Sequence, residues 1–212
     1  MEHDNPGRRI LEAKRLNQID VGLRREADEF LLGSGLGRLI SAAGYAPVGS
    51  YAMRTMVWRD LDFERMVDNP DWREHWEWGQ ALAEVEGVYR LSCVDAYRDP
   101  HIEDSGLYWG VRAICPNGAE WKLDLWTARP DEFAGLQRRA KWMELMTEES
   151  RLDVLAIKEA VHTHAEYRKT LLSVHVYEAV LEHGIANIEG FWDWWAAPAP
   201  TGDPEQCERP MR

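Results

Sequence analysis

Two different spacings of hydrophobic residues follow one another along the chain. In residues 8–43 apolar side chains such as Ile10, Leu16 and Leu23 recur with the period of a helix, and the glycines around Gly35 interrupt the pattern. From residue 60 onward polar and apolar residues alternate, as they do along a strand. The predicted strands cover residues 60–67, 88–96, 107–115 and 120–127, with a short apolar segment at 45–48 before them and a helix at 72–85 between the first two.

The last third of the sequence returns to the helical spacing. Pro130 suits the first turn of a helix, and helical patterns cover residues 131–146, 151–167 and 170–183. Asn117 and Gly118 lie between the last two predicted strands and indicate a tight hairpin. This order predicts an α+β fold, with a mixed sheet core, flanking N-terminal helices and a C-terminal helical lobe. The predicted divisions are residues 1–129 for the core with its N-terminal helices, 130–197 for the lobe and 198–212 for a disordered tail.

Composition narrows the classes of partner. The chain has 212 residues and a formal net charge of −12, a sign that opposes a broad set of contacts to DNA phosphates, so we expect no DNA partner. The same charge favours a cationic or neutral partner. No apolar run approaches the length that spans a bilayer, and the N-terminus lacks an apolar signal segment, so we expect no membrane partner and a cytoplasmic location. The three cysteines are too sparse for a disulfide framework or a zinc site.

Three aspartates form the candidate chemical centre. Asp60 and Asp62 are two positions apart on a predicted strand and therefore point to the same face. Asp124 lies between two leucines on another predicted strand, so its side chain points away from the core. Neighbouring carboxylates repel one another unless a cation lies between them, and carboxylate oxygens are ligands that Mg²⁺ prefers. If the two strands are neighbours, the three acids can hold two Mg²⁺ ions for an in-line displacement.

A candidate phosphate site precedes the first two acids. Gly49 allows the backbone to approach a phosphate closely. Ser50 follows at the expected start of a helical turn, where free N–H groups favour an anion. Arg54 lies four residues further on and can add a phosphate contact. We therefore expect Gly49, Ser50 and Arg54 to bind the nucleotide.

The combination resembles the nucleotidyltransferases of the DNA polymerase beta type, including the small antibiotic nucleotidyltransferases and the minimal toxin–antitoxin members. Gly49 and Ser50 match the phosphate-binding pair of that superfamily, Asp60 and Asp62 match its metal pair, and Asp124 matches its third carboxylate. The sequence departs from the common pattern because Arg54 and Arg59 stand where many members have smaller residues.

The resemblance implies a Mg²⁺-dependent transfer of a nucleotidyl group, with AMP from ATP expected, to a hydroxyl of a small-molecule acceptor, and release of pyrophosphate. The acidic composition would suit a cationic acceptor such as an amino sugar. The alternatives are a toxin-system enzyme that acts on protein or tRNA, and a non-catalytic nucleotide-binding module of the same fold. The sequence leaves the oligomeric state open.

Two further polar residues lie on the same strand faces. Glu64 continues the face of Asp60 and Asp62. It can be a further polar residue of the site, but we expect it to be an exposed acid at the end of the strand. Lys122 shares the face of Asp124, where it can contact a phosphate or form a salt bridge.

Overall fold

The computed structural model describes residues 6–99, 101–102, 105–132, 134–167 and 169–196. The contacts divide the chain into two compact units, one formed by residues 20–139 and the other by residues 1–19 together with 140–212. The domain boundaries expected from the sequence stay a prediction, and the expected tail at 198–212 lies outside the described residues.

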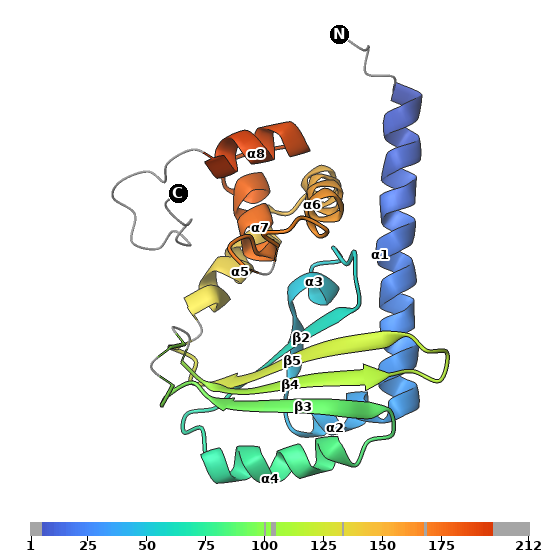
Figure 1. Cartoon of the computed structure of the whole chain (residues 1–212). Coiled ribbons are helices and arrows are strands. Elements are labelled where there is room, and N and C mark those ends of the chain that lie inside the picture. Colours follow the sequence, from blue (N-terminus) through green and yellow to red (C-terminus); the bar gives the residue numbers. More distant parts are fainter. Residues whose placement is uncertain (1–5, 100, 103–104, 133, 168, 197–212) are drawn as a thin grey trace. The chain divides into compact units, whose positions relative to one another are not determined.

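The first unit is built on a mixed sheet of five strands in the order β1-β2-β5-β4-β3 (Figure 1). The strands are β1 (Ala46–Val48), β2 (Asp60–Met66), β3 (Val88–Asp95), β4 (Leu107–Ile114) and β5 (Glu120–Ala128). The pair β2–β5 is parallel, and the other three pairs are antiparallel. The predicted α+β class and the four predicted strands are confirmed, and the short apolar segment at 45–48 forms the additional strand β1.

One face of this sheet forms the hydrophobic core. Leu61, Leu123 and Trp121 are almost completely buried, as expected for the apolar positions of alternating strands. The C-terminal part of α1 (Pro6–Ser34) packs there, where Phe30 stacks on Trp121 at 5.6 Å between ring centroids. Helices α2 (Leu36–Ala42) and α4 (Trp72–Ala83) also cover this face (Figure 1). Its opposite face carries the polar residues of the strands.

Turns of the expected type connect these elements. Gly35 has a φ of 80° and separates α1 from α2, as the interrupted helical pattern predicts. Gly118 has a φ of 83° in the turn between β4 and β5, a backbone conformation that glycine adopts without the steric cost of a Cβ atom. The hairpin predicted at Asn117 and Gly118 is therefore confirmed.

The second unit is helical. It contains α6 (Glu148–Val161), α7 (Ser173–Leu181), α8 (Ile188–Ala196) and the first part of α1, and α5 (Ala134–Leu145) leads into it. Arg151 is buried and binds Asn17 of α1, and Lys158 lies 5.3 Å from the ring centroid of Tyr177. Among the described residues, no helix combines the length and apolar character that crossing a membrane requires.

Candidate active site

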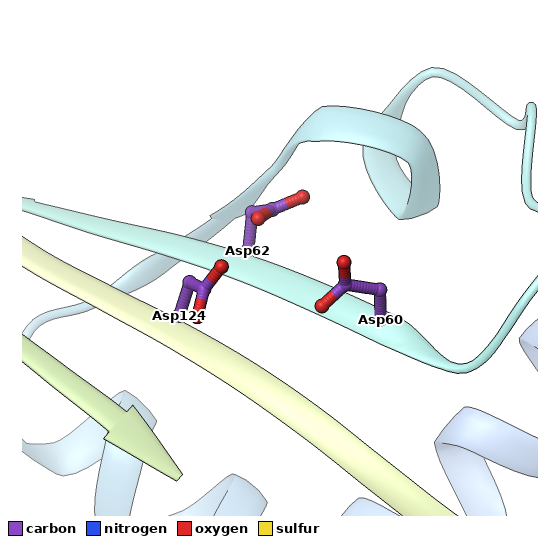
Figure 2. Close-up of side chains that lie close together, drawn as sticks. All are labelled: Asp60, Asp62 and Asp124. Carbon is purple, nitrogen blue, oxygen red and sulfur yellow. The ribbon is translucent and has the colours of Figure 1, made fainter. Parts of the chain in front are cut away.

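The structure brings the three predicted aspartates together. Asp60 and Asp62 lie on β2, and the parallel register places Asp62 directly opposite Asp124 on β5. One carboxylate oxygen from each residue lies within 4.8 Å of the other two. Figure 2 shows the three side chains on the same side of these neighbouring strands. Their alternation with buried leucine and phenylalanine residues keeps them on the face opposite the core.

This set of side chains fits a divalent metal. All three donors are carboxylate oxygens, which Mg²⁺ prefers, and magnesium sites commonly combine carboxylates with substrate phosphates. The Asp60 and Asp124 side chains are largely sheltered, with 17% and 18% of their surface exposed. Because partly buried like charges repel strongly, the cluster needs positive charge.

Lys122 supplies part of that positive charge. Its Nζ atom lies 3.3 Å from Asp60 Oδ1 and donates a hydrogen bond to Asp124 Oδ2. Burial alone would lower the pKa of Lys122, but the charges of Asp60 and Asp124 outweigh that effect and raise it. Of the two roles that the sequence left open for Lys122, the salt bridge is the one seen.

Tyr108 holds the other oxygen of Asp124. Its hydroxyl donates a hydrogen bond of 2.7 Å to Asp124 Oδ1, and burial together with the charge of Asp124 raises the pKa of Tyr108, so the phenol remains a donor. Gly110, directly opposite Asp124 on β4, makes this reach possible. A Cβ atom at Gly110 would lie 2.5 Å from the Tyr108 hydroxyl oxygen, so a larger residue would displace it.

The turn after β1 approaches Asp62 at Gly49. This residue begins the short helix α3 (Gly49–Ala52), which lies on the opposite side of the sheet from α2 and α4 (Figure 1). Gly49 has a φ of 62°, and a Cβ atom there would lie only 2.4 Å from Asp62 Oδ2. Both observations exclude a larger residue. Ser50 follows within the first turn of α3, next to this close approach.

Helix α1 holds α3 and the loop before β2. Asp20 is completely buried, and its Oδ1 atom accepts a hydrogen bond from the backbone N–H of Met56 at 3.0 Å. The Tyr51 hydroxyl donates a hydrogen bond to Asp28. These contacts fix the backbone on both sides of Arg54, and therefore the position from which β2 starts.

Arg54 occupies a conformation that suits glycine. It follows the last turn of α3 with a φ of 58°, and it is the one described residue other than glycine with a positive φ. Helices commonly end with glycine in this left-handed conformation. The exposed side chain of Arg54 is consistent with contact to a ligand.

The expectation for Glu64 was wrong. Only 10% of its side chain is exposed, and it forms an ion pair with Arg139. Burial raises the pKa of Glu64 against the opposing effect of Arg139. The error arose because alternation gives the face of a strand but not what covers that face.

Sequence reasoning also missed Tyr108 and Gly110. Both lie on the same face of β4 as Asp124 on β5, as their positions opposite Trp126 and Asp124 show. The hairpin at Gly118 could have revealed them, because counting back along both strands from the turn pairs Gly110 with Asp124.

No family model matches this sequence, and no curated protein matches it. Solved structures do match. The RNA terminal uridylyl transferase Cid1 is 16% identical with a TM-score of 0.54, over 81% of this chain and 53% of Cid1. A Cid1 poly(U) polymerase variant bound to MgATP is 14% identical with a TM-score of 0.57, over 82% of this chain and 55% of that chain. The structure of the GLD-2/RNP-8 complex is 14% identical with a TM-score of 0.51, over 80% of this chain and 64% of that chain.

This chain therefore shares the fold of these neighbours, which agrees with the α+β nucleotidyltransferase-type fold expected from the resemblance, and it carries an acidic triad. The present chain spans less than two thirds of the length of each of these neighbours.

Proposed function

We propose that this protein is a Mg²⁺-dependent nucleotidyltransferase that transfers AMP from ATP to an acceptor hydroxyl and releases pyrophosphate. The observation that carries the proposal is the convergence of Asp60, Asp62 and Asp124 within 4.8 Å, on the sheet face against which Gly49 packs. A close backbone approach beside clustered carboxylates suits a metal-bound triphosphate.

Each residue has a distinct part in the proposed reaction. Asp60 and Asp62 would each coordinate both Mg²⁺ ions, and Asp124 would coordinate one of them. Two Mg²⁺ ions, when bound, stabilise charge on the attacking and leaving oxygens. Gly49, Ser50 and Arg54 bind the β and γ phosphates. The binding of both substrates beside one rigid sheet brings the reacting atoms together and removes much of the entropic cost.

The bonds and protons of the reaction balance within this site. The acceptor oxygen forms a bond to the α-phosphorus as the bond from that phosphorus to the pyrophosphate oxygen breaks. The proton of the acceptor hydroxyl passes to Asp124, which acts as general base. The hydrogen bond from Tyr108 orients the carboxylate for this transfer.

The nature of the acceptor is part of the proposal. A small molecule is the expectation from the sequence, while Cid1 is described as an RNA terminal uridylyl transferase. A toxin-system enzyme acting on protein or tRNA, or a module that binds nucleotide without turnover, would use the same triphosphate site.

Pyrophosphate release tests the proposal. The purified protein would be incubated with Mg²⁺, each of the four ribonucleoside triphosphates, and pools of small molecules, RNA and protein. Asp62→Asn should lower turnover by more than about 100-fold, because losing a metal ligand costs more than losing a residue that only supports one. Asp68→Asn is the matched control, since Asp68 is an exposed acid just beyond β2. Equal activity of Asp62→Asn and wild type, or equal ATP binding with Mg²⁺ and with EDTA, would refute the metal site.

A further inference from the structure

A row of positive side chains runs from the carboxylates to the edge of the sheet. The strand registers place Asp60 opposite Lys122, Lys122 opposite Arg112, and Arg112 opposite Arg90. These residues therefore form one line across β2, β5, β4 and β3. We call Lys122, Arg112 and Arg90 the cation row.

All three cations point to the face of the sheet that carries the aspartates. Their neighbours along the strands, Trp121, Val111 and Leu91, belong to the core or pack against it on the other face. Arg90 is exposed, and 36% of the Arg112 side chain is exposed. The cation row is therefore open to a ligand within this unit.

The arrangement is costly for folding alone. Like charges directly opposite each other on neighbouring strands destabilise a sheet, and the row contains two such pairs. Glu120 offsets part of this cost, because its Oε1 atom accepts a hydrogen bond of 3.0 Å from Arg112 Nη1. That bond uses one of the five N–H donors of the guanidinium, so Arg112 keeps donors for an anion.

The adjacent line of residues offers space and hydroxyl groups. Asp124 is opposite Gly110, which is opposite Ser92 on β3. Gly110 has no side chain, and a Cβ atom there would lie 2.6 Å from Ser92 Oγ and 2.5 Å from the Tyr108 hydroxyl oxygen. The surface beside Asp124 therefore has no side chain at Gly110, and the hydroxyl groups of Tyr108 and Ser92 lie on either side of that position.

We propose that the cation row binds a phosphate group of the acceptor, so that the acceptor of this enzyme is a phosphate-bearing molecule. The inference rests on the proposed function, because it takes the triphosphate to lie over α3 at the β1–β2 side of the carboxylates. The acceptor then lies on the other side, over β4 and β3. Neighbouring strands are about 4.8 Å apart and two residues along a strand span about 6.8 Å, so an acceptor hydroxyl at Asp124 lies roughly 12 Å from a phosphate at Arg90, which is within the span of a nucleotide.

This local charge opposes the expectation from composition. The net charge of −12 favoured a cationic acceptor, but net charge is a sum over the whole surface. On β4 and β3, the strands on the far side of Asp124 from β2, the cation row presents Arg112 and Arg90, with Glu120 of β5 as a counter-charge. Charges within a few ångströms of the substrate dominate its binding, because salt screens those beyond about 8–10 Å.

Direct binding tests the cation row without catalysis. Fluorescence anisotropy of a short labelled oligoribonucleotide would be measured in EDTA for wild type and the double variant Arg90→Gln/Arg112→Gln. We expect the affinity of the double variant to fall about 10-fold and its salt dependence to become less steep, since two phosphate contacts are lost. Arg73→Gln is the matched control, because Arg73 is an exposed arginine on α4, which covers the other face. Circular dichroism would confirm that the variants fold.

Competition distinguishes the two sources of phosphate. A pentose phosphate that displaces the oligoribonucleotide, when the free pentose does not, indicates a phosphorylated small molecule. Binding of the oligoribonucleotide alone indicates the end of a nucleic acid. Either result supports the cation row. If wild type does not bind the oligoribonucleotide, or if the double variant binds it with the same affinity as wild type, the proposed phosphate binding by the cation row is overturned.

Transfer assays separate this inference from the proposed function. With ATP and Mg²⁺, the double variant should show a raised KM for the phosphate-bearing acceptor and an unchanged KM for ATP. If wild type and the double variant transferred the nucleotidyl group equally well to an amino sugar, the proposed binding of an acceptor phosphate by the cation row would be overturned, and the proposed nucleotidyl transfer would stand. Arginine-dependent binding without pyrophosphate release from any acceptor would refute the proposed function and leave the cation row intact.

Discussion

The close approach of Gly49 to Asp62 allows a sharp test of the site. In Gly49→Ala the new Cβ atom would lie 2.4 Å from Asp62 Oδ2, 3.2 Å from its Cγ and 3.3 Å from its Cβ. Rotation of the carboxylate can relieve the first contact but not the last, because the Cβ atom of Asp62 is fixed to β2. The turn and the strand must therefore move apart, and the Asp62 carboxylate must leave its present position.

Two effects contribute to the expected loss. The left-handed backbone at a φ of 62° costs about 1–2 kcal/mol for a residue with a Cβ atom. Separately, the Oδ2 atom of Asp62 must move by about 1 Å to regain an ordinary contact distance, and misplacement of that size can cost about 100-fold in rate. We therefore expect a modest loss of stability and a large loss of activity.

Gly118→Ala separates these two effects. Gly118 also has a positive φ, 83°, but a Cβ atom there meets nothing within 4 Å. Its turn joins β4 to β5. The two variants should thus lose a similar free energy of unfolding from backbone strain, measured by urea denaturation. Only Gly49→Ala should bind Mn²⁺ more weakly in calorimetry and release pyrophosphate about 100-fold more slowly. If Gly49→Ala matched Gly118→Ala in both metal affinity and turnover, the proposed role of this contact would be refuted.

Three further predictions follow from single residues. Tyr108→Phe removes the hydrogen bond to Asp124 and should lower kcat about 10-fold with an unchanged KM for ATP; a change in that KM alone would contradict a positioning role. Burial lowers the pKa of His75 from 6.5 to about 4, so the unfolded chain takes up its proton first, and this contribution to stability is complete above pH 6.5. It should be lost as the pH falls toward 4, by about 3 kcal/mol, and urea titrations of His75→Phe should show a shallower pH dependence than wild type over this range. Arg54→Gly removes the strain of a positive φ and should raise the free energy of unfolding by up to about 1 kcal/mol, while the KM for ATP rises; an unchanged KM would remove Arg54 from the phosphate site.

The sequence by itself determined the local features of this protein. Alternation placed Asp60, Asp62 and Asp124 on the polar faces of their strands. Asn117 and Gly118 indicated a tight hairpin turn, and Gly49 indicated a close approach of the backbone. These features depend on residues close together in the chain, whose periods and backbone preferences are written directly in the sequence. The order of the motifs then indicated the superfamily.

The tertiary structure decided which strands are neighbours and what covers them. The insertion of β5 between β2 and β4 places Asp62 opposite Asp124 and lets Tyr108 reach across Gly110. The tertiary structure also buries Glu64 in an ion pair with Arg139. The strand registers align Lys122, Arg112 and Arg90 in the cation row, so the charge of this row is opposite in sign to the net charge of the chain. Strand order and register arise from pairing between distant segments, and the alternation of side chains gives the face of each residue but not its partner.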